Sequence, residues 1–419
     1  GSRPYIGGSQ GNSVLELALG YNGLGRLTGD EVGSVGGGGG ANGGRWGETG
    51  ILRMFNDSYG GQASWLLPAA LILLAVGLWA TRRRKRTDPL RAGFVLWGGW
   101  LLTTALVFSL MQGIIHEYYT VALAPAIGAL IGAGAVLLWR VRRLPWARVV
   151  TAVTLAVTGW WAYVLLGRAT TFLPWLRWTV LIGALAVACA MLASRLVPRW
   201  TQRTVALAGL VIALAGPAAF GFQTAATAYG GAIVTAGPAS ANGRGGPGGT
   251  PPGGLQRQAG QNPDGAVRPD GSTSQTPLSG AGQAPPGGAA MGGQRGGAGG
   301  LLTATTPNEQ LKTVLSADAD RYTWVLATVG ANNAAGYQLA LQRPVMAIGG
   351  FNGSDDAPSL AQFQQWVGEG KVHYFLGGGG FQANGGSNVS RQIAAWVAAN
   401  FQAQTVGGIA LYDLTAGAQ

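Results

Sequence analysis

Six long apolar stretches constrain this chain of 419 residues more than any other feature of its sequence. Each is about 17–20 residues long, which is enough for a helix to cross a hydrocarbon layer of roughly 30 Å. Apart from Arg177, near the start of the fifth stretch, they contain no Asp, Glu, Lys or Arg. We therefore expect six transmembrane helices, at residues 64–80, 92–111, 120–139, 149–166, 174–193 and 204–222.

The net charge of +12 is concentrated in three short loops between these stretches, at residues 81–91, 140–148 and 194–203. These loops hold 13 of the 28 Lys and Arg residues but only one acid, Asp88. Loops of this kind stay on the cytoplasmic side of a membrane. We therefore expect a multi-pass cell-membrane protein with residues 1–63 and everything after residue 222 outside the cytoplasm. A nucleic-acid partner is not expected, because it would need a basic face on a folded module.

Beyond the last apolar stretch, the composition first becomes rich in Gly and Pro. Residues 231–300 contain 22 Gly and 9 Pro, and such a segment buries too little apolar surface to offset the entropy lost on ordering. We expect a disordered linker over residues 223–300, after the six helices of residues 64–222.

The last part of the chain, residues 301–419, alternates between strand and helix patterns, which predicts a small soluble α/β domain with a parallel sheet. Ser359 and Asn388 are suited to be N-caps of two of its helices. The expected strands are at 322–329, 345–351, 372–376 and 408–414, and the expected helices at 332–342, 359–369 and 388–401.

The loop before the third apolar stretch contains His116, Glu117, Tyr118 and Tyr119. Ionisable groups beside apolar spans are costly and are commonly functional. An imidazole, a carboxylate and two phenols are suited to bind a phosphate or a sugar at the membrane surface. The alternative is an interfacial loop whose tyrosines only anchor it at the level of the lipid headgroups.

Residues 1–63 are an irregular region rich in Gly, Asn and aromatic residues. Its glycines do not have the G-x-G-x-x-G spacing of a dinucleotide site. Arg53 is a candidate for binding a phosphate, although an ordinary polar loop would have a similar composition. The candidate substrate-loop residues are Tyr5, Asn12, Tyr21, Asn22 and Asn56.

Two glycine-containing loops follow expected strands of the α/β domain, at residues 349–356 and 377–380. Open α/β sheets bind ligands at this end of their strands, but the glycines are equally suited to turn the chain. The P-loop Lys-Ser/Thr pair is missing, so a nucleotide-triphosphate site is not expected. With Cys189 as the single cysteine, neither a disulfide framework nor a cysteine metal cluster is expected. No cofactor is evident, and a divalent metal is not indicated.

Three stretches, at residues 3–29, 47–68 and 116–132, resemble the C-terminal half of actinobacterial membrane glycosyltransferases of the YkcB-like, mannosyltransferase-like group. That group is related to the protein mannosyltransferases and aminoarabinose transferases. The linker and the α/β domain resemble the C-terminal domain of the same group. The resemblance implies a GT-C fold with its active site on the extracytoplasmic face.

Members of that superfamily transfer a sugar, here a mannose-like hexose or a pentose, from a polyprenyl-phosphate carrier to a lipid, protein or glycan acceptor. The resemblance implies that the loop at residues 116–119 lies near the lipid phosphate. It also implies that the catalytic Asp follows the first span of the family, so we expect this chain to be a C-terminal fragment that lacks it and is inactive alone. Asp30, Glu31 and Asp57 are not assigned that role.

Two other classes of function remain open from the residues alone. One is a membrane transporter or flippase, although such proteins usually carry ionisable residues inside their spans. The other is a membrane-anchored glycan-binding protein, in which residues 301–419 would carry all recognition.

Overall fold

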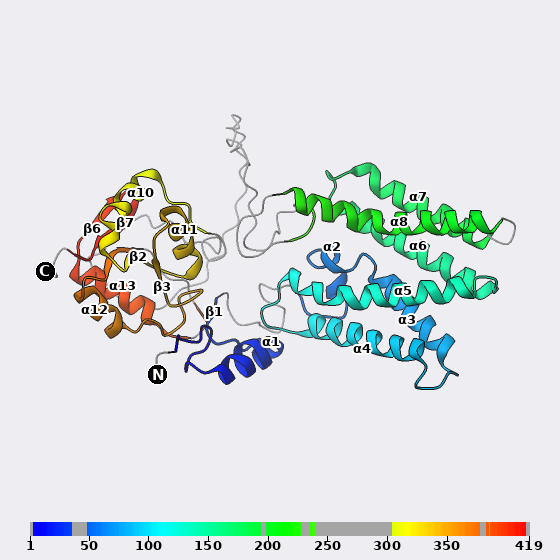
Figure 1. The fold of residues 1–419 in the computed structure, drawn as a ribbon, viewed down its shortest axis with the longest axis horizontal. Helices are drawn as coiled ribbons and strands as arrows, with labels where there is room; N and C mark the ends of the chain where they lie inside the picture. The colour runs from blue at the N-terminus through cyan, green and yellow to red at the C-terminus, as the bar shows by residue number, and fades with distance from the viewer. Residues whose placement is uncertain are drawn as a thin grey trace, which may run out of the picture.

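The computed structural model describes residues 3–35, 48–193, 198–227, 235–238, 304–377, 383–384 and 386–415. These residues form a bundle of long helices and a separate α/β domain, and an N-terminal segment lies between the two (Figure 1). Most of the expected linker, and most of the loop at residues 377–380, fall outside the described residues.

The bundle contains six main helices, which coincide with the six apolar stretches. Among the described residues, five helices are long and apolar enough to cross a membrane, with η4 and α5 counted as one. The remaining helix, α3, has 15 residues and rises about 22 Å, less than the thickness of a hydrocarbon core. The expected multispanning helical fold with an appended α/β domain is confirmed. The helices are α3 (Leu67–Thr81), α4 (Pro89–Leu110), η4 (Glu117–Leu123), α5 (Ala124–Arg140), α6 (Pro145–Gly167), α7 (Pro174–Leu192) and α8 (Arg199–Ala226).

Prolines and a polar cap determine where several of these helices begin. Pro68, Pro125 and Pro174 lie in the first turns of α3, α5 and α7, where the N–H that proline lacks would have no helical partner. The side chain of Asp88 caps α4, because it accepts a hydrogen bond from the N–H of Arg91 at 3.0 Å.

Glycines bring neighbouring helices of the bundle close together. A Cβ atom at Gly159 of α6 would collide with the Cβ of Ala184 on α7. A Cβ at Gly134 of α5 would lie 2.8 Å from the Cβ of Leu73 on α3. Small residues at helix contacts are the usual means of close packing inside a membrane, so these two helix pairs depend on their glycines.

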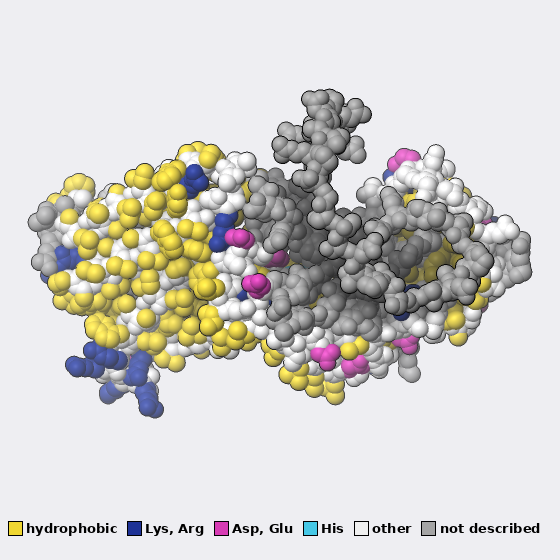
Figure 2. Space-filling view, turned by 180° about the vertical axis from the view of Figure 1, so that it is seen from behind, with side chains coloured by type: hydrophobic (Ala, Val, Ile, Leu, Met, Phe, Trp, Pro, Cys, Tyr) yellow, Lys and Arg dark blue, Asp and Glu magenta, His cyan; other side chains and the backbone are white. Residues whose placement is uncertain are grey.

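The outer surface of the bundle is broadly apolar (Figure 2). Leu96, Ile182 and Val211 are among its exposed side chains, and a group of Lys and Arg side chains projects at the end far from the α/β domain (Figure 2). Because successive helices run in opposite directions, the helix ends that flank the three basic loops all lie at that end, which we call the basic end. The opposite end of the bundle faces the N-terminal segment and the α/β domain (Figure 1).

The α/β domain is built on a five-stranded sheet with strand order β3-β2-β4-β7-β6. The first three of these strands are parallel, as expected, whereas β7 is antiparallel to both β4 and β6. The expected parallel sheet is therefore formed by three strands, and the sheet as a whole is mixed. The strands are β2 (Trp324–Val329), β3 (Val345–Ile348), β4 (Val372–Leu376), β6 (Ala403–Val406) and β7 (Ile409–Asp413).

The antiparallel pairing follows from a tight turn between the last two strands. Gly407 and Gly408 are the only residues between β6 and β7, and both have positive φ angles, 57° and 82°. Two-residue hairpin turns with positive φ at both positions match the twist of antiparallel strands and strongly favour glycine. The Gly-Gly pair between residues 403–406 and 409–413 was the available signal for this hairpin.

Two pairs of helices cover the two faces of the sheet, each with its own apolar cluster. Phe363 and Ile393, from α12 and α13, pack with Phe375 on one face. Leu311 and Tyr337, from α10 and α11, pack on the other face. The helices are α10 (Glu309–Ser316), η6 (Ala319–Arg321), α11 (Ala331–Leu341), α12 (Leu360–Gly368) and α13 (Val389–Asn400).

Only one of the two predicted N-caps in the domain is formed. The Oγ of Ser359 accepts a hydrogen bond from the N–H of Gln362 at 3.2 Å, which confirms it as the cap of α12. The side chain of Asn388 makes no capping bond. The N–H of Val389 instead donates to the Oγ of Ser387 at 3.1 Å, because a serine hydroxyl one residue earlier reaches the same helix start.

Candidate functional site

The N-terminal segment, residues 3–35, contacts both the bundle and the α/β domain. On the domain side, the carbonyl of Gly33 accepts hydrogen bonds from Nδ2 of Asn352 and Oγ of Ser354, both at 2.7 Å. On the bundle side, the N–H of Gly113 donates to the carbonyl of Arg26 at 3.0 Å. The elements of the segment are η1 (Glu16–Leu24), α1 (Gly25–Thr28) and β1 (Ser34–Val35), which pairs antiparallel with β5 (Ala383–Asn384) of the domain.

An ion pair between Arg26 and Glu31 forms the centre of the bundle side. Nη1 of Arg26 lies 3.2 Å from Oε1 of Glu31, and the Glu31 carboxylate accepts a hydrogen bond from the N–H of Ile114 at 3.0 Å. Glu31 is only 2% exposed, and burial raises the pKa of its carboxyl against the opposing effect of Arg26. The guanidinium also lies over the ring of Tyr21, 4.7 Å from the centroid. Arg26 is therefore held in one place.

His116 lies next to this ion pair, in a cluster of three rings. Its imidazole stacks on Tyr118 with 5.5 Å between the ring centroids and meets Tyr119 edge-on at 5.4 Å. The two tyrosine rings are 4.8 Å apart. Glu117 is the half-buried first residue of η4, and Tyr118 is exposed. The four residues expected from the sequence thus share one surface at the end of the bundle.

The environment of His116 keeps its imidazole neutral. Burial, together with the positive charge of Arg26, lowers the pKa of His116 to about 4, whereas an unfolded histidine titrates near 6.5. Between about pH 6.5 and pH 4 the unfolded chain binds a proton that the folded chain does not, so stability falls as the pH is lowered. We expect thermal unfolding in detergent at pH 7, 6 and 5 to show a weaker pH dependence for His116→Gln than for the wild type.

The other histidine provides the control for this measurement. His373 lies buried in β4 between the rings of Tyr322 and Tyr374, and burial lowers its pKa as well. His373→Gln should therefore keep the contribution of His116 to the pH dependence of stability. Only the double variant should lose the contributions of both histidines. An identical pH dependence in the wild type and His116→Gln would contradict the neutral state of the half-buried His116.

Arg53 is buried beside the end of α4. It is 2% exposed, and Nη1 donates to the carbonyl of Met111 at 2.7 Å, just after α4 ends. Its guanidinium lies over the ring of Tyr59, whose hydroxyl donates to the carbonyl of Ile115 at 3.1 Å. The predicted direct contact of Arg53 with a donor phosphate does not fit this buried position. Arg53 instead supports the loop that presents His116.

Asn56 also has a structural position, in the turn between η3 (Arg53–Phe55) and α2 (Gly60–Ala63). Its Oδ1 accepts hydrogen bonds from the N–H groups of Ser58 and Tyr59, both at 3.0 Å, as asparagine commonly does in turns. Its carbonyl accepts from Nη1 of Arg168 at 2.7 Å, and Arg168 is paired with Asp57 at 3.2 Å. The structure therefore does not place Asn56 with the other substrate-loop residues.

A cavity of about 420 Å³ lies between the N-terminal segment and the α/β domain. It is at the carboxyl ends of β2 and β3, the usual ligand position in open α/β sheets. Oδ1 of Asp355 accepts a hydrogen bond from the N–H of Gly8 at 2.9 Å, and burial raises the pKa of this carboxyl. The main polar residues of the lining are Gln10, Tyr21, Asn22, Asn352, Ser354 and Asp355.

Tyr5 and Asn12 hold the N-terminal segment in shape and do not line this cavity. Oδ1 of Asn12 accepts a hydrogen bond from the N–H of Ile6 at 3.0 Å. The hydroxyl of Tyr5 donates to the carbonyl of Ser9 at 2.5 Å and accepts from the N–H of Asp356 at 3.3 Å. Of the five predicted substrate-loop residues, Tyr21 and Asn22 therefore reach the cavity.

Arg26 and Asp355 are among the site residues that sequence reasoning did not single out. Arg26 is the only Lys or Arg between Arg3 and Arg45, which was an available signal. Its pairing with Glu31 and its closeness to His116 were not, because they depend on how distant segments pack. Asp355 belongs to the loop at residues 349–356, which was predicted as a possible ligand loop. Nothing in the sequence showed that Asp355 faces residues 7–33 across a cavity.

In the part of the chain that the structure describes, no three His, Cys, Asp or Glu side chains gather closely enough to hold a metal ion. Cys189 is a free cysteine on α7.

Comparison with known proteins bears on both parts of the molecule. Residues 311–400 match the family described as "Putative mannosyltransferase YkcB-like, C-terminal". The chain is 29% identical to "Putative mannosyltransferase YkcB" of Bacillus subtilis (strain 168), in an alignment covering 95% of this chain and 60% of that protein. The chain is thus similar to this protein over nearly its whole length. "Putative mannosyltransferase YycA" of the same organism is 24% identical, with coverage of 95% and 61%.

This similarity confirms the resemblance predicted from the three sequence stretches. With the long apolar helices, it indicates a multi-pass membrane protein. The chain spans about 60% of the length of the curated YkcB-like relatives that it matches. No solved structure matches it significantly.

Proposed function

We propose that this chain is part of a membrane glycosyltransferase that takes a sugar from a polyprenyl-phosphate donor. The observation that carries the proposal is the guanidinium of Arg26, held by Glu31 next to His116 at the end of an apolar bundle. A lipid-linked sugar has the matching parts, namely an apolar chain, an anionic phosphate and a polar head. The names of the similar proteins, both putative mannosyltransferases, support sugar transfer. The sugar proposed here is a mannose-like hexose or a pentose.

Arg26 and the ring cluster are suited to receive the phosphate. The phosphate gains negative charge as the bond to the sugar breaks, and preplaced donors stabilise that charge. A guanidinium forms strong, directional hydrogen bonds with phosphate oxygens. His116 stays neutral at pH 7 because of its low pKa, so it donates a hydrogen bond without adding a charge. The hydroxyls of Tyr118 and Tyr119 are further donors.

The cavity at the sheet edge is the proposed place for carbohydrate, either of the donor or of the acceptor. Its carboxylate and amides offer both acceptors and donors, which sugar hydroxyls require. Its volume of about 420 Å³ lies within the range of small-molecule sites, about 300–1,000 Å³. The ring of Tyr21 lines this cavity and also lies beneath Arg26, so it connects the two halves of the site.

Transfer also needs a base that deprotonates the acceptor. We place this base outside these 419 residues, as the family resemblance implies. Glu31 is unsuited to the role because it is buried against Arg26 and the N–H of Ile114. The basic loops imply that the His116 end faces away from the cytoplasm, so the acceptor is an extracytoplasmic lipid, protein or glycan.

Sugar transfer by the product of the whole reading frame tests this function. Membranes containing it, supplied with a polyprenyl-phosphate mannose labelled in the sugar, should move the label to an acceptor. His116→Ala should lower turnover about tenfold, the loss of one neutral hydrogen bond to the developing charge, without changing the melting temperature at pH 7. Arg83→Gln at the basic end is the control and should have wild-type turnover.

Two outcomes would contradict the proposal. Failure of folded protein to transfer mannose or a pentose from any polyprenyl-phosphate donor would overturn the donor class. Unchanged turnover by a well-expressed His116→Ala variant would remove the ring cluster from the phosphate site.

The cavity also favours a second candidate function, a membrane-anchored glycan-binding protein. In that case the full chain in detergent would bind methyl α-mannoside or a short mannan in calorimetry. Asp355→Asn would abolish this binding, and Arg26 variants would leave it unchanged. The transferase proposal instead makes the Arg26 region necessary for productive binding of the lipid-linked sugar.

A further inference from the structure

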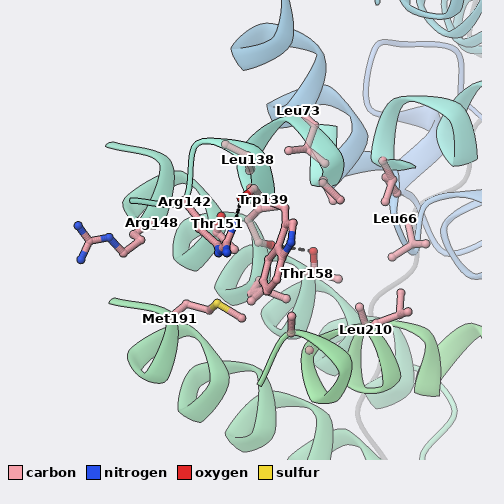
Figure 3. A pocket seen from close by; sticks show the side chains of 18 of the residues that line it. Leu66, Leu73, Leu138, Trp139, Arg142, Arg148, Thr151, Thr158, Met191 and Leu210 are labelled. Carbon is pink, nitrogen blue, oxygen red and sulfur yellow. Dashed lines mark hydrogen bonds between the residues drawn. The ribbon is translucent and has the colours of Figure 1, made fainter. Parts of the chain in front are cut away.

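A second cavity, of about 220 Å³, lies inside the bundle between α3, α5, α6, α7 and α8. Figure 3 shows that its two ends differ in chemistry: Arg148 and Arg142 lie toward one end, and Leu66 and Leu210 toward the other. The arginines belong to the basic end of the bundle. The cavity therefore runs from the basic end toward the middle of the apolar layer.

Apart from its arginine end, the cavity presents an apolar wall. Thr151, Thr154 and Thr158 line it on α6, but each hydroxyl donates to the carbonyl four residues earlier, at 2.7–2.8 Å. These hydroxyl groups thus donate their hydrogen bonds within the helix and not into the cavity. The remaining lining is mostly Ala, Leu, Ile and Met, which suits a hydrocarbon chain.

Arg148 is a buried cation in an unfavourable place. It is 6% exposed and lies in the first turn of α6 (Pro145–Gly167), where the helix dipole disfavours positive charge. Nη2 donates to the carbonyl of Arg143 at 3.1 Å, but Nε is buried without a hydrogen-bond partner among the described residues. A buried charge is costly unless an opposite charge or hydrogen bonds accompany it.

Arg142 is held at the same end of the cavity. Its guanidinium lies over the ring of Trp139, 4.4 Å from the centroid, and Nη1 donates to the Trp139 carbonyl at 2.7 Å. Nε donates to Oε1 of Gln202 on α8 at 3.4 Å. These contacts orient the cation without neutralising it.

The chain offers no carboxylate that could neutralise these two arginines from within the bundle. Between residues 64 and 227 the sequence contains only two acids, Asp88 and Glu117. Asp88 is paired with Arg84 at 3.2 Å, and Glu117 lies at the opposite end, at the start of η4. The counter-charge must therefore come from outside these helices.

We propose that this cavity binds one anionic glycerophospholipid from the leaflet at the basic end, with its phosphate on Arg142 and Arg148 and an acyl chain along the apolar wall. A free anion would match the arginines but leave the cavity empty, whereas a lipid matches both. The phosphate of the sugar donor proposed above belongs at the other end of the bundle. This second lipid is thus a bilayer lipid bound as part of the structure.

Lipid binding to the full chain, stripped of lipid in detergent, tests this site. Native mass spectrometry and thermal unfolding should show that dioleoyl phosphatidylglycerol binds and stabilises the protein, and that dioleoyl phosphatidylcholine does so far less. Arg142→Gln/Arg148→Gln should weaken binding of phosphatidylglycerol about tenfold or more, because each cation near a lipid phosphate contributes measurably to affinity. Arg83→Gln/Arg86→Gln removes the same charge from the exposed loop and should bind normally.

A variant with the cavity filled, Ala213→Phe, leaves both arginines in place and should also lose binding. If the arginine variant does not fold, the lipid comparison on the wild type together with Ala213→Phe decides the question. Equal stabilisation by the two lipids, or equal losses in the two double-arginine variants, would overturn the site. Tighter binding of undecaprenyl phosphate than of phosphatidylglycerol through the same arginines would overturn the assignment to a glycerophospholipid.

Discussion

Replacing Arg26 by Met is expected to weaken binding of undecaprenyl phosphate to the chain in detergent by about 10- to 100-fold. This loss corresponds to about 1.5–3 kcal/mol, the contribution of a hydrogen bond to a charged group. Undecaprenol, which lacks the phosphate, should bind the wild type and the variant equally. Binding is the appropriate measurement, because it does not require a base from outside the chain.

The design must separate a role of Arg26 in phosphate binding from its role in structure. Arg26→Met alone leaves the Glu31 carboxylate buried without its cation, and breaking such a pair costs about 3–5 kcal/mol of stability. Arg26→Met/Glu31→Gln removes that stranded charge and should melt near the wild-type temperature. Glu31→Gln alone keeps the guanidinium and should bind the phosphate nearly as well as the wild type.

These variants distinguish the two roles of Arg26. A double variant that is stable but does not bind undecaprenyl phosphate would support direct contact between Arg26 and the phosphate. Recovery of wild-type affinity in the double variant would show that Arg26 only holds the loop around Ile114, and it would overturn the proposed phosphate site.

Replacing Gly159 by Leu is expected to lower the melting temperature of the protein in detergent by about 5–10 °C. The new side chain would enter the contact between α6 and α7, where even a Cβ collides with Ala184. Overpacking of this kind costs about 1–3 kcal/mol, and 1 kcal/mol shifts the melting temperature of a fold of this size by about 2–4 °C.

Gly128 provides a matched control for this substitution. It lies on α5, and a Cβ there would have no neighbour within 4 Å. Gly128→Leu changes helix propensity and apolar surface in the same way as Gly159→Leu, so it should melt at or above the wild-type temperature. Equal losses in the two variants would show that the α6–α7 contact does not depend on its glycine.

The helical bundle could be predicted from the sequence because its signal is local. A run of apolar residues long enough to span a bilayer requires a helix, since every backbone polar group must be satisfied within the segment. The boundaries were less accurate: α8 begins at Arg199 and ends at Ala226, whereas the expected span was 204–222. A helix continues past its apolar part wherever water or neighbouring side chains allow.

The candidate site could be predicted only in part. The cluster at residues 116–119 consists of four consecutive residues, so these side chains were certain to lie near one another. Arg53 was expected to bind a phosphate, but the structure buries it, and sequence alone does not show which side of a loop is buried. Tyr5, Asn12 and Asn56 were equally plausible as ligands, but their side chains are used in local turns.

The sequence by itself determined the apolar helices, the basic end and the presence of an α/β domain, because these follow from composition and from periodicity over short windows. Only the tertiary structure decided which cation stands beside His116, how Asp355 meets Gly8 across the cavity, and how β7 pairs with β4. Each of these contacts joins segments far apart in the sequence. Their geometry follows from packing, which no local pattern of residues specifies.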